Sequence, residues 1–339
     1  MMAQVQTAAR PIICAGNWIV DIVHTIDHWP ANSDLARIKH ADQGVGGGAA
    51  NVAFALKALD GDLDIVPVGR VGTDEYGDFI VRSCETAGLP IGHLSRDPQA
   101  PTAHTHVMNL AGDSRTFFYQ GGANDAFTSD HVPVAQLGGS GIFYFGYLML
   151  LGRFDSLRSD GSTMAGDMLR DVRAAGMVTC VDIVSAAHDD FAKIVAAALP
   201  HVDYLIINEV EAGRVTGGAL ADRASMEAAA RTLLDMGVQC AVVIHTADEA
   251  IWVPKMGDAA HQPSQTLAAD QIVSPVGAGD AFCAGVLYGL HQHWSPETCL
   301  ALAHRAAAAS LGKVTATEGI PAVGSLMNDA PMEPEVKAS

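Results

Sequence analysis

The chain has 339 residues, 49% of them hydrophobic, so it can bury a substantial core in one large domain or two ordinary ones. Its 20 basic and 38 acidic residues give a formal net charge of −18, which repels nucleic-acid backbones and anionic membrane surfaces. These partners are therefore disfavoured. A phosphate site would have to use local backbone N–H groups, a metal or a few basic side chains.

The distribution of cysteines and apolar residues indicates a cytoplasmic setting. The six cysteines lie far apart, without a CxxC pair, which favours a reducing compartment. The first 17 residues, MMAQVQTAARPIICAGN, lack the continuous apolar stretch of a signal peptide. No later apolar run approaches the length needed to span a bilayer. We therefore expect a soluble cytoplasmic protein.

Short β-branched or aromatic runs alternate with segments of helical periodicity along the chain. The predicted strands cover residues 11–17, 64–69, 142–148, 177–183, 203–208 and 240–245. The predicted helices cover residues 49–59, 168–176, 223–237 and 296–312, and one more begins within 274–290. Because each crossover between parallel strands needs a helix, this order predicts an α/β fold. Its central sheet should be mostly parallel, with helices on both faces.

Residues 101–120 break this alternation. They read as two strands with one polar face, joined by the turn-like sequence AGDS, and are too polar for central parallel strands. We expect a small β lid from segments of about 22–45 and 100–125. His104 and His106 share one face of a predicted strand, which would allow a two-histidine metal site, although no third ligand is evident. The tail, 328–339, is expected to be frayed.

The sequence GVGGGAAN (44–51) formally matches the dinucleotide fingerprint GxGxxA at Gly44, Gly46 and Ala49. That fingerprint needs a buried strand leading into it, and the preceding residues are charged and polar, so an NAD-dependent oxidoreductase is disfavoured. A plain structural turn remains open. We favour a substrate loop, because consecutive glycines admit a ligand close to the backbone and Asn51 offers a donor and an acceptor.

The sequence GAGD (277–280) leads into an apolar, helix-like run. Gly277, Ala278 and Gly279 carry little side chain, so their N–H groups can converge on an anion at a helix N-terminus. Asp280 would repel that anion unless it takes a proton from an attacking hydroxyl, and it could equally be a helix cap. Both interpretations stand on these residues alone. No GxxxxGK[ST] occurs, which excludes a P-loop.

Five segments, in this order, resemble the ribokinase-like (PfkB) carbohydrate kinase family. They are GNWIVD (16–21), GGGAANVA (46–53), GRVGTDEYG (69–77), NEVE (208–211) and GAGD (277–280). The resemblance implies one ribokinase-like kinase domain over residues 11–320, which would transfer a phosphoryl group from ATP to a hydroxyl of a sugar or sugar-like molecule. Two alternatives are a nucleoside kinase of the same fold and a non-catalytic sugar- or nucleotide-binding relative.

The resemblance also implies a role for each matching residue. Asp280 would be the general base, and the backbone of residues 277–279 would form the anion hole. Asn208 and Glu211 would organise Mg²⁺ through water, although by themselves they read as an N-cap and its capping-box partner. The acceptor would be bound by Asp21, Gly47, Gly48, Asn51, His106 and Arg115. The nucleotide would be bound by Asn208, His245, Ala247, Gly277, Gly279 and His304.

Three segments depart from the family pattern. Ser274-Pro275 stands where the family usually has Asp-Thr, which removes a carboxylate that helps to hold a monovalent cation, so potassium activation is doubtful. HTADEA (245–250) has His245, Ala247 and Ala250 in place of a threonine and two glycines, and His304 stands where a small amide or cysteine is frequent. These changes sustain the binding-only alternative. We also expect a possible homodimer through the lid strands, whose edges are unpaired.

Overall fold

The computed structural model describes residues 10–110, 115–137, 139–268, 271–274, 276–313, 315 and 318–328. Within them the main sheet has nine strands in the order β13–β12–β11–β10–β9–β8–β1–β4–β5. From β11 to β5 all neighbours pair in parallel, whereas β12 and β13 form an antiparallel edge. Their bounds are β1 (Ile12–Gly16), β4 (Ile65–Gly72), β5 (Leu94–Asp97), β8 (Ile142–Leu148), β9 (Val178–Ile183), β10 (Tyr204–Asn208), β11 (Ala241–His245), β12 (Glu249–Pro254) and β13 (Ala260–Pro263).

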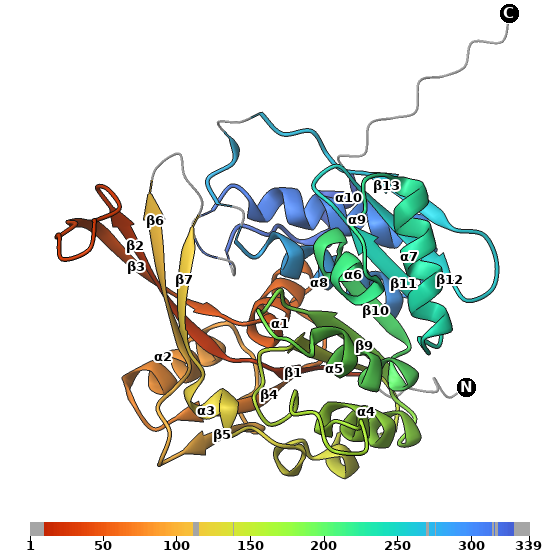
Figure 1. Cartoon of the computed structure of the whole chain (residues 1–339), viewed down its shortest axis with the longest axis horizontal. Helices are drawn as coiled ribbons and strands as arrows, with labels where there is room; N and C mark the ends of the chain where they lie inside the picture. Colours follow the sequence, from red (N-terminus) through yellow and green to blue (C-terminus); the bar gives the residue numbers. More distant parts are fainter. Residues whose placement is uncertain are drawn as a thin grey trace, which may run out of the picture.

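Helices cover both faces of this sheet, as the alternating sequence pattern predicts (Figure 1). One face packs against α1 (Gly48–Leu59), α2 (Glu75–Thr86), α8 (Ala278–His291) and α9 (Pro296–Ser310). The other packs against α4 (Met164–Ala174), α5 (Phe191–Ala198), α6 (Glu209–Thr216) and α7 (Arg223–Asp235). The short helices are α3 (Gly122–Asp125), α10 (Val323–Asn328), η1 (Ser129–His131), η2 (Val134–Gln136) and η3 (Leu199–His201).

The central strands form because their side chains are buried on both faces, and the helices are stabilised by caps at their ends. Strand β8, IFYFGYL, is buried along almost its whole length, as expected of a central parallel strand. Helix α2 begins at Asp74, whose carboxylate accepts a hydrogen bond from the N–H of Gly77.

A second sheet of four strands, in the order β3–β2–β6–β7, projects from the body and fits the expected β lid (Figure 1). Its strands are β2 (Ile19–Ile26), β3 (Ile38–Gly46), β6 (His104–Leu110) and β7 (Thr116–Gln120). Gly44 and Gly46 lie in β3, which is mostly exposed, so no buried strand leads into the GxGxxA match. The turn at 111–114 and the tail beyond Asn328 lie outside the described residues.

The order of the main sheet reverses between β1 and β8. From β1 the chain proceeds to β4 on one side, and from β8 it proceeds through β9 to β11 on the other. Ligands of open α/β sheets bind at the carboxyl ends of strands that flank such a point. The two strands approach each other closely there, because Gly16 (φ 134°) faces the carbonyl of Gly146 with no room for a side chain.

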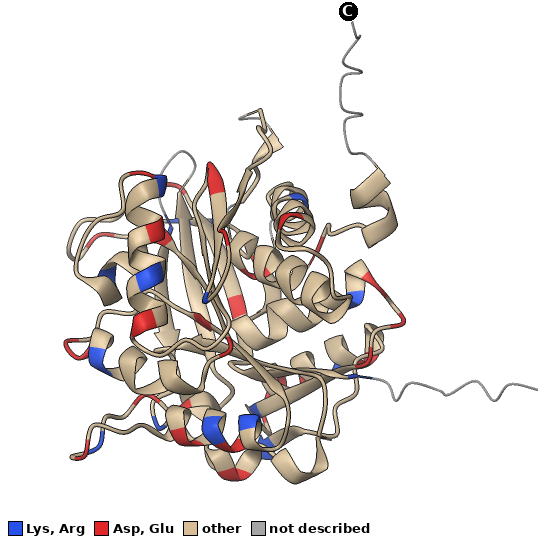
Figure 2. Cartoon of the chain, turned by 90° about the vertical axis from the view of Figure 1, so that its right-hand side faces the viewer, with Lys and Arg blue, Asp and Glu red and all other residues tan. Residues whose placement is uncertain are grey.

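Charged residues of both signs lie mainly on the outer helices and loops, often on the same helix, as Figure 2 shows. Most buried side chains are hydrophobic, and the buried acidic residues include Asp182, Glu211 and Asp280. Among the described residues, no helix combines the length and the apolar character needed to cross a membrane.

Candidate active site

The N-terminus of α8 separates two cavities. Its N-cap is Gly277, in a left-handed conformation (φ 82°) that glycine adopts without strain. Gly277 and Gly279 line a cavity of about 150 Å³, and Ala278 and Gly279 line a second of about 590 Å³. The first backbone N–H groups of a helix have no intrahelical partner, and the helix dipole favours negative charge there. This helix end can therefore bind an anion where the two cavities meet.

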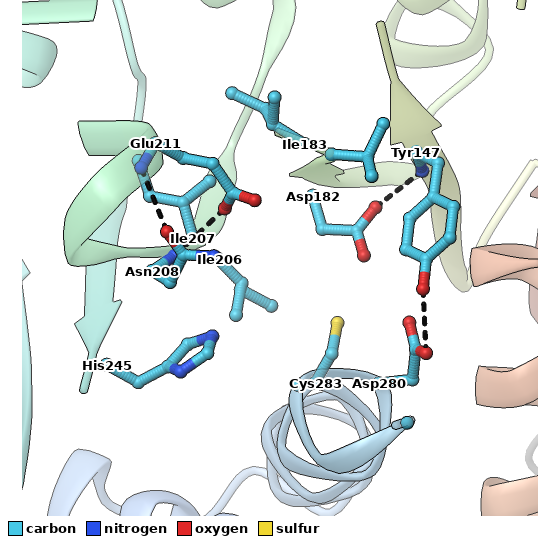
Figure 3. A pocket seen from close by; sticks show the side chains of 13 residues that line it. Tyr147, Asp182, Ile183, Ile206, Ile207, Asn208, Glu211, His245, Asp280 and Cys283 are labelled. Atoms are coloured by element: carbon cyan, nitrogen blue, oxygen red, sulfur yellow. Dashed lines mark hydrogen bonds between the residues drawn. The ribbon is translucent and has the colours of Figure 1, made fainter. Parts of the chain in front are cut away.

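Asp280 lies in the first turn of α8 and is only 4% exposed. Its Oδ2 accepts a hydrogen bond from Asn51 Nδ2 at 2.8 Å and one from the Tyr147 hydroxyl at 2.9 Å. Figure 3 shows the bond with Tyr147. Burial raises the pKa of Asp280 to about 6, the two hydrogen bonds oppose that rise, and the nearby charge of Asp21 adds to it. The carboxylate is thus ionised at neutral pH, yet more basic than an exposed aspartate.

The smaller cavity is acidic. Asp182, Glu211 and Asp280 all line it, and no lysine or arginine does so among the described residues. Burial raises the pKa of Glu211 to about 7 and the pKa of Asp182 well above its usual value. Figure 3 shows these three side chains around one space. Carboxylate oxygens are hard ligands, and a cation in this cavity would offset their charge.

Asn208 and Glu211 form a reciprocal cap at the start of α6. Asn208 Oδ1 accepts from the N–H of Glu211 at 2.9 Å, and Glu211 Oε2 accepts from the N–H of Asn208 at 3.0 Å. The capping-box interpretation is therefore correct, and both residues also line the acidic cavity. Among the described residues no three His, Cys, Asp or Glu side chains form a direct metal cluster. The donor set nevertheless fits Mg²⁺ held through its water shell.

The larger cavity is lined by the residues predicted to bind the nucleotide, except Gly277, which lines only the smaller cavity. His245, Ala247 and His304 line it, together with apolar side chains that include Val210, Ile272 and Leu311. The His245 ring packs against Phe282 with centroids 4.6 Å apart, and burial lowers the pKa of His245 to about 4, so the ring is neutral. His304 Nε2 donates to the carbonyl of Gln262 at 3.1 Å. Asn208, His245 and Gly279 line both cavities.

Asp21 occupies the inner face of the lid, the face toward Asp280. It lies in register with Thr105 of β6, and Thr105 lies in register with Tyr119 of β7. Burial raises the pKa of Asp21 to about 6, and a hydrogen bond with Thr105 opposes the rise. The Asp21 carboxylate fills the space that a side chain at Gly46 would need. Arg115 lines a small pocket with Asp21.

His106 lies on the outer face of the lid, opposite to Asp21. It is in register with Ile22 of β2 and Phe118 of β7, and successive side chains of a strand point to opposite faces. Its Nδ1 is 3.0 Å from His24 Nε2, and the two rings are stacked with centroids 5.3 Å apart. The structure therefore does not bring His106 together with the other residues predicted to bind the acceptor.

The remaining predicted acceptor residues begin α1 beside Asp280. Gly47 (φ 94°) is the N-cap, and a side chain there would come within 2.6 Å of the carbonyl of Asn17. Gly48 packs against the Tyr147 ring, and Asn51, one turn later, reaches Asp280. Ser274 is fully buried, and its hydroxyl accepts from the N–H of Val276 at 3.2 Å. Pro275 lies outside the described residues.

Three residues at the site were not singled out from the sequence: Tyr147, Asp182 and Thr105. Asp182 is near the end of a predicted buried strand, a position that itself signals a site in α/β folds. Thr105 becomes visible only through the register of the lid. Tyr147 has a positive φ of 60°, which the sequence of β8 does not indicate.

Comparisons with known proteins point to one family. Residues 11–323 match the family described as pfkB family carbohydrate kinase. A ribokinase from Arabidopsis thaliana is 26% identical over 320 residues, covering 91% of this chain and 77% of the relative. An adenosine kinase from Saccharomyces cerevisiae is 26% identical over 280 residues, covering 79% and 78%.

The structure of Arabidopsis thaliana ribokinase complexed with ribose and ATP superposes with a TM-score of 0.78 at 22% identity, covering 94% of this chain and 98% of that one. At this identity the likeness concerns the fold, including the large sheet and the small lid sheet. The family match, which spans nearly the whole chain, also shows the family to which the protein belongs. The protein is a member of the pfkB family of carbohydrate kinases, which are ATP-dependent kinases.

Proposed function

We propose that the protein transfers the γ-phosphoryl group of ATP to a hydroxyl of a sugar or sugar-like small molecule, with Asp280 as the general base. The observation that carries this proposal is the position of Asp280. Its carboxylate lies in the first turn of α8, lines the smaller cavity next to Gly279, which faces both cavities, and is fixed through Oδ2 by Asn51 and Tyr147. Such a base can meet an acceptor from one side and a phosphoryl donor from the other.

In the proposed reaction, the hydroxyl proton of the acceptor passes to Asp280 as the hydroxyl oxygen bonds to the γ-phosphorus. The bond between that phosphorus and the β–γ bridging oxygen breaks, and ADP leaves. Negative charge spreads over the transferring oxygens, and the backbone N–H groups of Gly277, Ala278 and Gly279 lie at the helix end suited to stabilise it. Preorganised donors of this kind need no rearrangement during the reaction.

Asn208 and Glu211 would hold Mg²⁺ through water in the acidic cavity. When bound, this ion supplies positive charge to the phosphate oxygens. Their reciprocal cap keeps both side chains in place before any ligand binds. The larger cavity, with His245, Ala247 and His304, would receive the nucleotide, because its apolar side chains suit a base and its inner end reaches α8.

The acceptor would lie between the lid and the body. Asp21 can accept two hydroxyl hydrogen bonds at once, and Asn51 with the glycine backbone at 47–48 lies across from it. Arg115 Nη1 is buried without a partner among the described residues, so it can bind an acceptor or phosphate oxygen. His106 was predicted to bind the phosphoryl acceptor, but it lies on the outer face of the lid, away from Asp21.

Two alternatives rest on specific observations. The similarity to a yeast adenosine kinase keeps a nucleoside acceptor open. The altered sequence at 245–250 keeps a binding-only relative open, because His245 and Ala247 stand where the family pattern has other residues. The absence of the usual aspartate at Ser274 leads us to expect little activation by potassium.

The test is an ADP-release assay against a panel of sugars, sugar acids and nucleosides, with the Asp280→Asn protein as control. We expect turnover with at least one acceptor, and a loss of roughly 10²–10⁴-fold or more in kcat for Asp280→Asn, while binding measured by calorimetry is retained. Binding without ADP release across the panel would favour the binding-only relative. Near-normal turnover in Asp280→Asn would refute the role of Asp280.

We also propose that the lid supports a homodimer. Its edge strands carry exposed apolar side chains, including Ile38 (50% exposed), Phe117 (56%) and Phe118 (54%). Unpaired strand edges with such residues are prone to pair with another chain. Light scattering should give a dimeric mass, and the double substitution Phe117→Ser and Phe118→Ser should shift it to the monomer. A monomeric mass for the unmodified protein would contradict this proposal.

A further inference from the structure

Tyr147 occupies an irregularity in the central sheet next to the site. Phe145 pairs with Val181 and Leu148 pairs with Ile183, so two residues of β8 oppose the single residue Asp182 of β9. This arrangement is a β-bulge, a feature that redirects a side chain and is frequent beside active sites. Tyr147 is the second of the two residues, and its φ of 60° is unfavourable for a bulky side chain.

The bulge is held by the carboxylate it faces. The N–H of Tyr147 donates to Asp182 Oδ1 at 2.6 Å, and the hydroxyl of Tyr144 donates to Asp182 Oδ2 at 2.7 Å. Asp182 therefore supplies the acceptor that the interrupted ladder does not, and it is itself fixed by a second donor from the same strand. The unusual backbone conformation of Tyr147 is thus stabilised by a buried side chain.

The bulge directs the Tyr147 ring past α1 to Asp280. A Cβ at residue 48 would lie 2.5 Å from Tyr147 Cδ1, so the ring has room only because that residue is glycine. The hydroxyl at the end of the ring is 2.9 Å from Asp280 Oδ2 (Figure 3). The same oxygen accepts a hydrogen bond from Asn51. No described residue donates a hydrogen bond to the other oxygen, Oδ1.

We propose that Tyr147 is a positioning residue, whose hydroxyl holds Asp280 through Oδ2 so that Oδ1 is presented to the acceptor hydroxyl. This inference rests on the proposed role of Asp280 as the base. The surroundings make the hydroxyl important, because the other groups near Asp280 are acidic or neutral. They are Asp21 from the lid, Asp182 from β9, Tyr144 from β8, Cys283 from α8 and Asn51 from α1.

A hydroxyl that donates to a carboxylate stabilises its ionised form, so Tyr147 keeps the pKa of Asp280 below the value that burial alone would give. Tyr147→Phe removes this hydrogen bond and keeps the ring. We expect kcat to fall roughly ten- to a hundredfold, with the acceptor KM changed by less than about threefold. We also expect the acidic limb of the kcat–pH profile to move upward by roughly 0.5–1 pH unit.

Tyr144→Phe is the matched control. It also removes a buried hydroxyl that donates to Asp182, but this hydroxyl does not contact Asp280. We expect the acidic limb of the kcat–pH profile of Tyr144→Phe to lie at the same pH as in the unmodified protein. Tyr147 is not a positioning residue if Tyr147→Phe retains the kcat of the unmodified protein. The same holds if the variant loses activity while the acidic limb of its kcat–pH profile does not shift.

The Asp280→Asn protein separates this inference from the proposed function. If Asp280→Asn is inactive while Tyr147→Phe behaves like the unmodified protein, only the role of Tyr147 is refuted. If Asp280→Asn turns over normally, the base assignment is refuted, and the role of Tyr147 is refuted with it.

Discussion

The two walls of the proposed acceptor site are built differently. On the body wall, Asp280 receives hydrogen bonds from Asn51 of α1 and Tyr147 of β8, and Tyr147 is held by the buried carboxylate of Asp182 and packs against Gly48. On the lid wall, Asp21 lies on a four-stranded sheet that projects from the body, with Thr105 as its side-chain partner. Rigid support keeps a catalytic group at the position where it meets the reacting atom, whereas a projecting sheet is suited to cover a bound ligand. We therefore expect the body wall to govern turnover and the lid wall to govern affinity.

The largest effect should come from crowding the body wall. Gly48→Ala would place a methyl group against the Tyr147 ring and move its hydroxyl away from Asp280. We expect kcat to fall about a hundredfold, as for a displacement of roughly 1 Å at a catalytic group. Gly92→Ala is the control, because nothing lies within 4 Å of the added methyl group there. Equal kcat values for the two variants would contradict a rigid body wall.

Removing the charge of the lid wall should act on affinity instead. Asp21→Asn keeps the size of the side chain but weakens its hydrogen bonds to acceptor hydroxyls. Since hydrogen bonds to charged groups contribute about 1.5–3 kcal/mol, we expect the acceptor KM to rise roughly 10–100-fold. The KM for ATP should remain unchanged, because Asp21 lies outside the larger cavity. A fall in kcat with no change in the acceptor KM would contradict the expectation that the lid wall governs affinity.

The pH dependence should report the body wall as well. The pKa of Asp280 is raised to about 6, so protonation below that pH removes the base. We expect kcat to be level above about pH 7 and to fall roughly tenfold by pH 5. The measurement is kcat at saturating acceptor across this range. A level profile down to pH 4.5 would show that Asp280 does not titrate as proposed.

The smallest effects should distinguish the two faces of the lid. Thr105 and His106 are neighbours in β6 but point to opposite faces. Thr105→Val removes the hydroxyl that hydrogen-bonds Asp21, and we expect the acceptor KM to rise about threefold. For His106→Ala we expect a change below about twofold. If His106→Ala has the larger effect on KM, the acceptor site extends to the outer face.

The fold could be predicted to a large extent from the sequence, because parallel strands buried on both faces read as continuous apolar runs. The runs at 142–148 and 240–245 became β8 and β11 with nearly the same bounds. The lid could be recognised because its strands alternate. Strands β12 and β13 were not predicted. The edge strand β13, AHQP, carries few apolar residues, whereas β12, EAIWVP, is mostly apolar and was simply missed.

The site could be predicted where its residues lie in a local motif, and less well where they meet across strands. GAGD begins α8, and NEVE caps α6, as their spacing indicates. His106 was grouped with Asp21, because the register between β2 and β6, which decides the face, depends on contacts distant in sequence. Tyr147 was missed because a bulge, not its sequence neighbours, points its hydroxyl at Asp280.

The wall shared by the two cavities has a thermodynamic consequence. Asn208, His245 and Gly279 each face both spaces, so a ligand on one side fixes atoms that a ligand on the other side also contacts. We expect binding of a nucleotide in the larger cavity and of a cation in the smaller one to be coupled, and linkage requires that each changes the affinity of the other by the same factor. The first ligand to bind reduces the conformational entropy of the shared wall, so the second ligand loses less entropy when it binds. Dissociation constants measured for each ligand alone would therefore underestimate the stability of the ternary complex.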